Sequence, residues 1–257
     1  MGKGLQGLTI KDNFMFAATM LEEENCRALL ECIFLRRIER VDISYEKSIV
    51  YHPEYKGVRL DVFCVDEKNT HFNVEMQVAD KEIKKRARYY HSQVDMEILL
   101  AGAEYEELPD SYMIFICDFD PFGYGKYCYT VKHSFKEVPE QDYEDGAYTI
   151  FLSTKGKNDS DVSKELVAFL KFVGANLEES EDDFHSELVE RMQRTIRRIK
   201  QDREMRGRYM LFEEMMRDEF KAGKGILKAD GQLDRDSVTF ESVLHHLQNM
   251  VEVRARN

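Results

Sequence analysis

Two strand-like segments, separated by a short polar loop, constrain the fold of this chain most. Residues 58–65 (VRLDVFCV) are rich in residues that favour β-strands. Residues 72–78 (FNVEMQV) alternate between apolar and polar side chains, as in a strand with one face in the core. Because residues 66–69 between them are polar or charged, we predict a β-hairpin. It brings three polar residues of interest into one region: Asp61, Glu75 and Gln77.

The register of this hairpin decides whether the carboxylates of Asp61 and Glu75 meet. Directly opposed residues of an antiparallel pair point to the same face of the sheet. A slip by one residue would therefore place Asp61 on the wrong face. The two side chains meet only if one of two pairings forms, Val65 with His71 or Cys64 with Thr70. We therefore expect a hairpin loop with an odd number of residues, or a β-bulge.

Two carboxylates on neighbouring strands repel each other unless a positive charge lies close to both. A hard cation such as Mg²⁺ relieves this repulsion, because it takes carboxylate oxygens as ligands. A bound Mg²⁺ also acidifies water and stabilises charge on a phosphate, as phosphodiester hydrolysis requires. The paired carboxylates therefore favour a metal-dependent hydrolase.

A long helix with a basic first half is expected over residues 80–104. Its apolar residues recur at spacings of three and four: Ile83, Ala87, Tyr90, Val94, Ile98 and Ala101. Its first three turns carry most of its basic residues: Lys81, Lys84, Lys85, Arg86 and Arg88. Positive charge at a helix N-terminus opposes the helix dipole. That placement is easier to explain if an anion such as phosphate binds there.

The other segments predict a mixed sheet that is followed by helices. A helix is expected over residues 24–34, and strands over 41–45, 112–117, 126–133 and 147–152. Further helices are expected over 163–173, 184–200 and 204–220. The expected fold class is therefore α/β, with a mixed central sheet flanked by helices and a helical C-terminal subdomain. We divide the chain into a core of residues 1–155, a helical subdomain of residues 156–222 packed on it, and a weakly patterned tail of residues 223–257.

Four short motifs in a fixed order make this chain resemble the PD-(D/E)XK nuclease superfamily. In that arrangement a helix precedes an Asp on one strand and Glu-x-Lys on the next, with Gln in place of Lys in some branches. The chain looks like the Rpn group of recombination-promoting nucleases, also described as PD-(D/E)XK family transposases. The resemblance covers about residues 9–220 and depends on these motifs: Lys11-Asp12-Asn13-Phe14, Arg59-Leu60-Asp61-Val62, Val74-Glu75-Met76-Gln77 and Arg86-Ala87-Arg88-Tyr89-Tyr90.

The resemblance implies a restriction-endonuclease-like core and a metal-dependent DNA endonuclease linked to recombination or mobile elements. In such an enzyme Asp61 and Glu75 would bind Mg²⁺, or Mn²⁺ as a substitute, together with the backbone carbonyl of Met76. Gln77 would orient the attacking water. Asp12 would be a further carboxylate near the metal.

The resemblance also gives the basic helix a supporting role in the site. Arg86 and Tyr90 lie four residues apart and share a helix face. They would contact the scissile phosphate or hold the acidic residues in place. Because Gln77 cannot supply the positive charge of a lysine, Lys85 or Arg86 would supply part of it.

Charge and cysteine content narrow the partners and the compartment. The net charge of −12 argues against a protein that coats nucleic acid non-specifically, but not against a nuclease with local basic groups. The five cysteines include no CxxC pair, so we expect a reducing compartment, the cytoplasm. The first residues lack the apolar segment of a signal peptide, and no apolar run approaches the length that spans a bilayer. We therefore expect DNA as the partner and no membrane, and a homodimer stays open.

Each candidate site residue also has a purely structural explanation. Asp61 could pair with Arg59 on an exposed face, and Glu75 alternates with apolar residues as any half-exposed strand does. Thr9 and Asp12 have the spacing of a capping box at a helix start. The Arg and Tyr of the basic helix could form a structural pair at the helix–sheet interface.

These explanations leave two further functions open beside the DNA endonuclease. The chain could be a non-catalytic module on a nuclease-like fold that binds DNA or a protein. That function predicts carboxylates that point apart or are bridged by an arginine. The chain could also be a nuclease directed at RNA, because the same site chemistry would serve.

Overall fold

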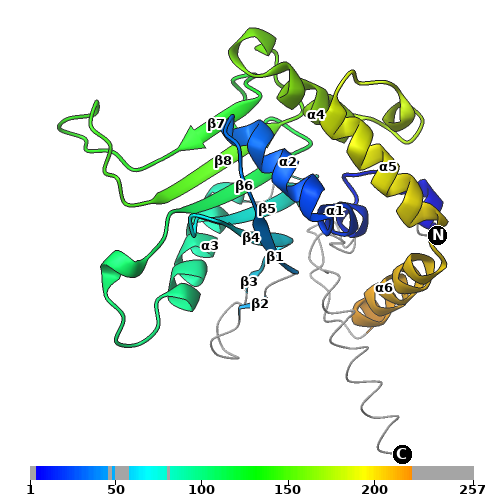
Figure 1. The fold of residues 1–257 in the computed structure, drawn as a ribbon, viewed down its shortest axis with the longest axis horizontal. Coiled ribbons are helices and arrows are strands. Elements are labelled where there is room, and N and C mark those ends of the chain that lie inside the picture. The colour runs from blue at the N-terminus through cyan, green and yellow to red at the C-terminus, as the bar shows by residue number, and fades with distance from the viewer. Residues whose placement is uncertain (1–3, 46–47, 50–57, 80–81, 222–257) are drawn as a thin grey trace, which may run out of the picture.

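A mixed β-sheet forms the centre of the molecule (Figure 1). The structure is a computed structural model that describes residues 4–45, 48–49, 58–79 and 82–221. The strands of this sheet are β1 Val41–Tyr45, β4 Val62–Asp66, β5 His71–Gln77, β6 Ser111–Cys117, β7 Cys128–Val131 and β8 Ala147–Ser153. Their order across the sheet is β1-β4-β5-β6-β8-β7. A separate two-stranded sheet pairs β2 (Ser48–Ile49) with β3 (Val58–Arg59).

The direction of the strands creates one edge at which several strand ends meet. Strands β5, β6 and β8 are parallel to one another. Strand β4 is antiparallel to β5, so β4 begins where β5 ends. We call this edge the carboxyl edge and define it by the residues at the strand ends: Asp61 before β4, Gln77 at the end of β5, Asp118 after β6, and Thr154 and Lys155 after β8.

Helices cover both faces of the sheet. Their bounds are α1 Asn13–Met20, α2 Glu23–Phe34, α3 Ile83–Ile98, α4 Lys164–Gly174, α5 Glu187–Gln201 and α6 Arg203–Lys221. Short 3-10 helices span Leu5–Gly7, Tyr105–Glu107, Asp159–Asp161 and Glu179–Glu181. Helices α1, α2, α4 and α5 pack on one face, and α3 packs on the other (Figure 1). Each face therefore has its own apolar core, and the mixed α/β architecture expected from the sequence is confirmed.

The strand expected over residues 58–65 is divided at Leu60 and Asp61 into β3 and β4. Leu60 and Phe63 are both buried in the core beneath α3. Residues three apart in a regular strand point to opposite faces, so the chain must leave the extended conformation to bury both. This interruption places Asp61 just outside the β4 ladder.

Other boundaries also differ from the expected ones. The basic helix is shorter than 80–104, because it ends at Ile98 and is followed by a turn in which Gly102 has φ of 91°, a conformation that glycine adopts without strain. Helix α5 begins later than expected, because the Ser186 side chain caps it by accepting the backbone N–H of Val189 at 3.1 Å. The expected tail of residues 223–257, like Lys81 of the basic helix, lies outside the described residues. Within the part of the chain that is described, no helix has the length and apolar character needed to cross a membrane.

Candidate active site

The β4–β5 hairpin forms in one of the two registers that bring the carboxylates together. Val65 pairs with His71. Continued past the end of β4, this register places Asp61 opposite Glu75. Alternation along β5 directs Glu75 to the face that α3 covers, because Met76 belongs to the core on the other face. The expected register is therefore confirmed.

The loop of the hairpin fixes this register. The backbone N–H of Asp66 donates to the carbonyl of Thr70 at 3.1 Å, which leaves three residues, 67–69, in the loop. Asn69 adopts a left-handed conformation with φ of 62°, which asparagine tolerates better than most residues. The Asp66 carboxylate accepts the backbone N–H groups of Lys68 at 3.0 Å and Thr70 at 2.8 Å. The loop thus has the odd length that the pairing of the two carboxylates requires.

Reciprocal hydrogen bonds join Asp61 and the end of β5 at the carboxyl edge. The backbone N–H of Asp61 donates to Glu75 Oε1 at 3.1 Å. In return, Asp61 Oδ2 accepts the backbone N–H of Met76 at 3.2 Å. The N–H and C=O of a strand residue point toward the same neighbour, so the Met76 carbonyl is directed to the side of Asp61. Three oxygen-bearing groups therefore converge where the β4 ladder stops.

Arg86 of α3 connects Glu75 to the other polar residues of the site. Its Nη2 donates to Glu75 Oε2 at 2.9 Å, and its Nη1 donates to Gln77 Oε1 at 2.8 Å. Its Nε donates to the hydroxyl of Tyr90 at 2.9 Å. The guanidinium therefore uses all three of its nitrogen atoms within one cluster. The four-residue spacing places Arg86 and Tyr90 on the same helix face, as expected.

Burial sets the electrostatics of this cluster. The Glu75 side chain has no exposed surface, and 28% of the Arg86 side chain is exposed. Burial raises the pKa of Glu75, while the Arg86 charge and the hydrogen bonds from Asn73 and Asp61 lower it. Burial would lower the pKa of Arg86, but the Glu75 carboxylate outweighs this effect and raises it. Burial also raises the pKa of Tyr90, which keeps its hydroxyl protonated.

Asn73 is a polar residue of the site that the sequence did not single out. Its side-chain nitrogen donates to Glu75 Oε1 at 3.0 Å, and its side chain is buried. Its side-chain oxygen has no hydrogen-bond partner among the described residues. An amide oxygen is a ligand type that hard cations accept. Position 73 lies on the same strand face as Glu75, and that alternation was the signal that could have identified it.

The chemistry of these donors fits a single hard cation. The carboxylates of Asp61 and Glu75 and the carbonyl of Met76 offer only oxygen, the ligand atom that Mg²⁺ takes. The described residues contain no group of three or more His, Cys, Asp or Glu side chains placed to hold a metal. A cation here would therefore need water or phosphate to complete its coordination, as Mg²⁺ usually does. It would also compete with Arg86 for Glu75.

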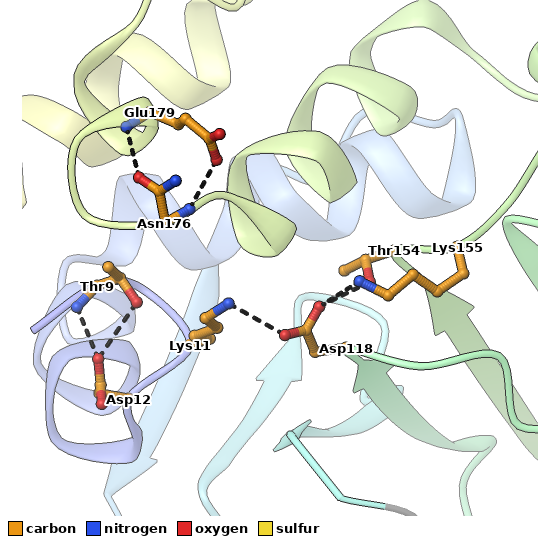
Figure 2. Close-up of polar contacts among 8 residues, drawn as sticks. All are labelled: Thr9, Lys11, Asp12, Asp118, Thr154, Lys155, Asn176 and Glu179. Carbon is orange, nitrogen blue, oxygen red and sulfur yellow. Dashed lines mark hydrogen bonds and ion pairs between the residues drawn. The ribbon is translucent and has the colours of Figure 1, made fainter.

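Two of the expected site residues have different surroundings. Asp12 Oδ2 accepts the backbone N–H of Thr9 at 2.7 Å and its hydroxyl at 3.2 Å (Figure 2). The expected capping box is wrong, because α1 begins at Asn13 with Asp12, not Thr9, as its N-cap, and the contact closes the turn before the helix. Lys85 is exposed on α3, one residue before Arg86. The hydrogen-bonded cluster therefore contains Asp61, Glu75, Gln77, Arg86 and Tyr90.

One comparison with known proteins identifies the family of this chain. The family model described as PD-(D/E)XK nuclease family transposase matches residues 13–224. No curated protein and no solved structure matches the chain. The matched range includes the whole β-sheet and helices α1 to α6, and therefore most of the chain. This protein belongs to the PD-(D/E)XK nuclease family transposases and has their restriction-endonuclease-like α/β fold.

Proposed function

We propose that this protein is a divalent-metal-dependent DNA endonuclease that acts in recombination or in the movement of mobile elements. Its family associates the chain with nuclease chemistry and transposition. The observation that carries the proposal is the position of Asp61 beside Glu75 at the carboxyl edge, where each carboxylate accepts a backbone N–H from the neighbouring segment. Opposed carboxylates of this kind are ligands for a hard cation.

The cation would be held by Asp61 and Glu75, with the Met76 carbonyl as a third oxygen ligand. Mg²⁺ suits a set of oxygen ligands, and Mn²⁺ would substitute for it. When bound, the ion supplies an acidified water and stabilises the charge that develops on the phosphate. Asp61 is half-buried whereas Glu75 is fully buried, so access to the site would be from the side of Asp61.

Gln77 would act as a hydrogen-bond donor to the attacking water or the phosphate. A guanidinium can only donate, so the contact with Arg86 identifies the atom of Gln77 that faces it as the side-chain oxygen. The amide nitrogen is therefore the end that is directed away from Arg86. Gln77 would then replace the donor function of a lysine but not its charge.

Arg86 and Tyr90 would position the other residues of the site. Arg86 contacts both Glu75 and Gln77, so it fixes the spacing between a metal ligand and the donor to water. Tyr90 accepts from Arg86 and limits the rotation of the guanidinium. Both act through the residues that they hold.

A second candidate function is a non-catalytic module that binds DNA or a protein. One specific observation favours it: Arg86 forms an ion pair with Glu75 at 2.9 Å, which neutralises the carboxylate without a metal. Carboxylates bridged by an arginine were one expected mark of such a module, and here the arginine holds one of the two carboxylates, Glu75. The two functions differ in whether a divalent cation changes the behaviour of the site.

Cleavage of supercoiled plasmid tests the proposal. The wild type should nick or cut the plasmid in Mg²⁺ or Mn²⁺ but not in EDTA. The Asp61→Asn variant keeps the size of the side chain and removes a ligand charge, so we expect it to lose cleavage while retaining its circular dichroism spectrum.

Asp42→Asn is the matched control for this experiment. Asp42 is an exposed residue of β1 that pairs with Arg40 at 3.0 Å, so the substitution makes the same chemical change away from the site. It should leave cleavage intact. Metal-independent cleavage, or cleavage that survives in Asp61→Asn, would refute the proposal. Cleavage of RNA alone would redirect it to an RNA substrate.

A further inference from the structure

A second charged cluster lies at the carboxyl edge, on the opposite face of the sheet from Glu75. Asp118 follows β6 and is its centre. Lys11 Nζ donates to Asp118 Oδ2 at 3.1 Å, and Lys155 Nζ donates to Asp118 Oδ1 at 3.0 Å (Figure 2). The Thr154 hydroxyl also donates to Asp118 Oδ1, at 2.9 Å. These residues come from three distant parts of the sequence.

Backbone hydrogen bonds place this cluster next to the candidate active site. The N–H of Asp118 donates to the carbonyl of Gln77 at 2.8 Å, and the N–H of Thr154 donates to the carbonyl of Cys117 at 3.0 Å. The parallel ladder therefore continues one residue past the strands. Because side chains alternate, Asp118 lies on the face opposite to Cys117, which belongs to the core beneath α3. The cluster and the site thus flank the same strand ends.

The end of α4 forms a wall beside the cluster. A Cβ placed on Gly174, the last residue of α4, would lie 3.3 Å from the Thr154 Cβ and 3.8 Å from Asp118 Oδ1. The Asp118 side chain is consequently only 17% exposed, whereas Lys11 is 24% and Lys155 is 53% exposed. The carboxylate is covered, and the Lys155 side chain is the most exposed of the three.

The cluster carries an excess of positive charge. Burial would raise the pKa of Asp118, but the hydrogen bonds from Lys155, Lys11 and Thr154 outweigh it and lower the pKa, so the carboxylate is ionised at neutral pH. Two ammonium groups and one carboxylate leave one net positive charge. Each ammonium has three N–H donors, and one of them is used on Asp118. The remaining donors can bind a phosphate.

The cluster lies within reach of a DNA strand that would cross the carboxyl edge. Strands in a sheet lie about 4.8 Å apart, so the end of β8 is roughly 10 Å from the end of β5. Each DNA strand carries one phosphate per about 3.4 Å of helix axis. Because the backbone winds around that axis, consecutive phosphates of one strand lie farther apart than this rise. A strand whose scissile phosphate lies at Asp61 and Glu75 would therefore present a nearby flanking phosphate to the cluster.

We infer that Lys11 and Lys155, positioned by Asp118, bind a backbone phosphate of duplex DNA that flanks the scissile phosphate. The inference rests on the proposed function, since it assumes that the substrate crosses the carboxyl edge. It assigns the local basic contact that a chain of net charge −12 needs to hold a polyanion. Contacts of this type fix the register of the duplex but do not read its sequence.

The salt dependence of DNA binding tests this inference. Binding of a fluorescent duplex is measured by anisotropy in EDTA, where no divalent ion is present, over roughly 50 to 200 mM KCl. The slope of log K against log salt is negative, and loss of one phosphate contact reduces its magnitude by about 0.9. We expect this decrease for Lys11→Gln and for Lys155→Gln, and recovery of the wild-type slope in Lys11→Arg.

Lys132→Gln is the matched control. Lys132 directly follows β7 at the opposite edge of the sheet, and it forms an ion pair with Asp142. Its substitution should leave the slope unchanged. An unchanged slope in Lys11→Gln and Lys155→Gln, or the same decrease in the control, would overturn the inference. So would a lowered melting temperature with no change of slope, because the cluster would then be a structural tie between α1, β6 and β8.

Binding and cleavage together separate this inference from the proposed function. If the lysine variants show a shallower slope but the wild type never cuts plasmid, the phosphate contact is supported and the nuclease function is refuted. If the wild type cuts plasmid in a metal-dependent way but the lysine variants keep the wild-type slope, the nuclease function is supported and the phosphate contact is refuted. A chain that binds RNA but no duplex DNA would overturn the phosphate contact as stated.

Discussion

The substitution Arg86→Met tests the electrostatic reasoning about the site most directly. Methionine has a comparable length but no charge and no N–H donor. It would leave the fully buried Glu75 carboxylate with two neutral donors, the Asn73 side chain and the Asp61 backbone. Removing one partner of a buried ion pair costs about 3–5 kcal/mol. We expect a loss near 3 kcal/mol, because these two hydrogen bonds remain.

A double-mutant cycle separates the ion pair from its surroundings. Glu75→Gln alone should cost about 1–2 kcal/mol, because the partly exposed Arg86 can reach water. The double variant Arg86→Met with Glu75→Gln should cost no more than Arg86→Met alone, which implies a coupling energy of at least about 1–2 kcal/mol. Urea denaturation followed by circular dichroism measures all four proteins. Additive effects would refute the pairing.

The pH dependence of Arg86→Met gives an independent check. Without the arginine, burial raises the pKa of Glu75 above its value in the unfolded chain. The folded state then binds a proton more tightly than the unfolded state, so its stability is lost as the pH rises from about 4 through the folded pKa. The variant should therefore lose more stability at pH 8 than at pH 5, relative to the wild type. Equal losses at both values would contradict the assignment of the buried charge.

Three other substitutions probe the hairpin and the support of the site. Asp66→Asn should cost about 1–2 kcal/mol, because it weakens the contact of Asp66 with Arg36 at 2.7 Å. Burial would raise the pKa of Asp66, but the hydrogen bonds to its carboxylate outweigh burial and lower the pKa. The difference in stability between the variant and the wild type, measured by urea unfolding, should therefore vanish as the pH falls below about 4. Asn69→Val should cost about 1–3 kcal/mol in thermal unfolding, because a β-branched residue is strained at φ of 62°, and Asn69→Gly should not. Tyr90→Phe should cost about 1 kcal/mol, because Arg86 Nε loses its acceptor, and an unchanged urea midpoint would show that water replaces the hydroxyl.

The sequence predicted the local parts of the site and their faces. Alternation along β5 placed Glu75 and Gln77 together, and the requirement that Asp61 meet Glu75 predicted the register. The helical spacing of Arg86 and Tyr90 predicted their shared face. All of these follow from backbone periodicity, which depends on neighbours in the chain.

Contacts between distant parts of the chain were not predictable in the same way. Lys11 and Asp118 are 107 positions apart, and no local pattern links them. The signal that could have identified Asp118 is its place directly after a buried apolar strand, where parallel strand ends meet. The break at Leu60 was also missed, because it results from burial of Leu60 and Phe63 in the same core and not from the strand propensity of the segment.

The basic start of α3 shows how a correct sequence signal can have more than one source. The cluster of positive charge there predicted a bound anion. In the structure, Arg86 contacts the Glu75 carboxylate, and Lys84 Nζ lies 4.9 Å from the centre of the Phe122 ring. An anion of the chain itself therefore satisfies the part of the signal that Arg86 carries.

This internal anion connects the two candidate functions. If a cation binds Asp61 and Glu75, it neutralises the carboxylate that now holds Arg86, and the guanidinium gains the freedom to contact a phosphate. If no cation binds, the ion pair is the final state and the site is inert. Mg²⁺ should therefore stabilise Arg86→Met more than the wild type, because the ion replaces a missing positive charge there and displaces an existing one in the wild type. A gain of about 2.7 kcal/mol at one hundred times the dissociation constant is the expected scale in urea unfolding. Equal unfolding curves with Mg²⁺ and with EDTA, in both proteins, would leave the arginine-bridged binding module as the function of this site.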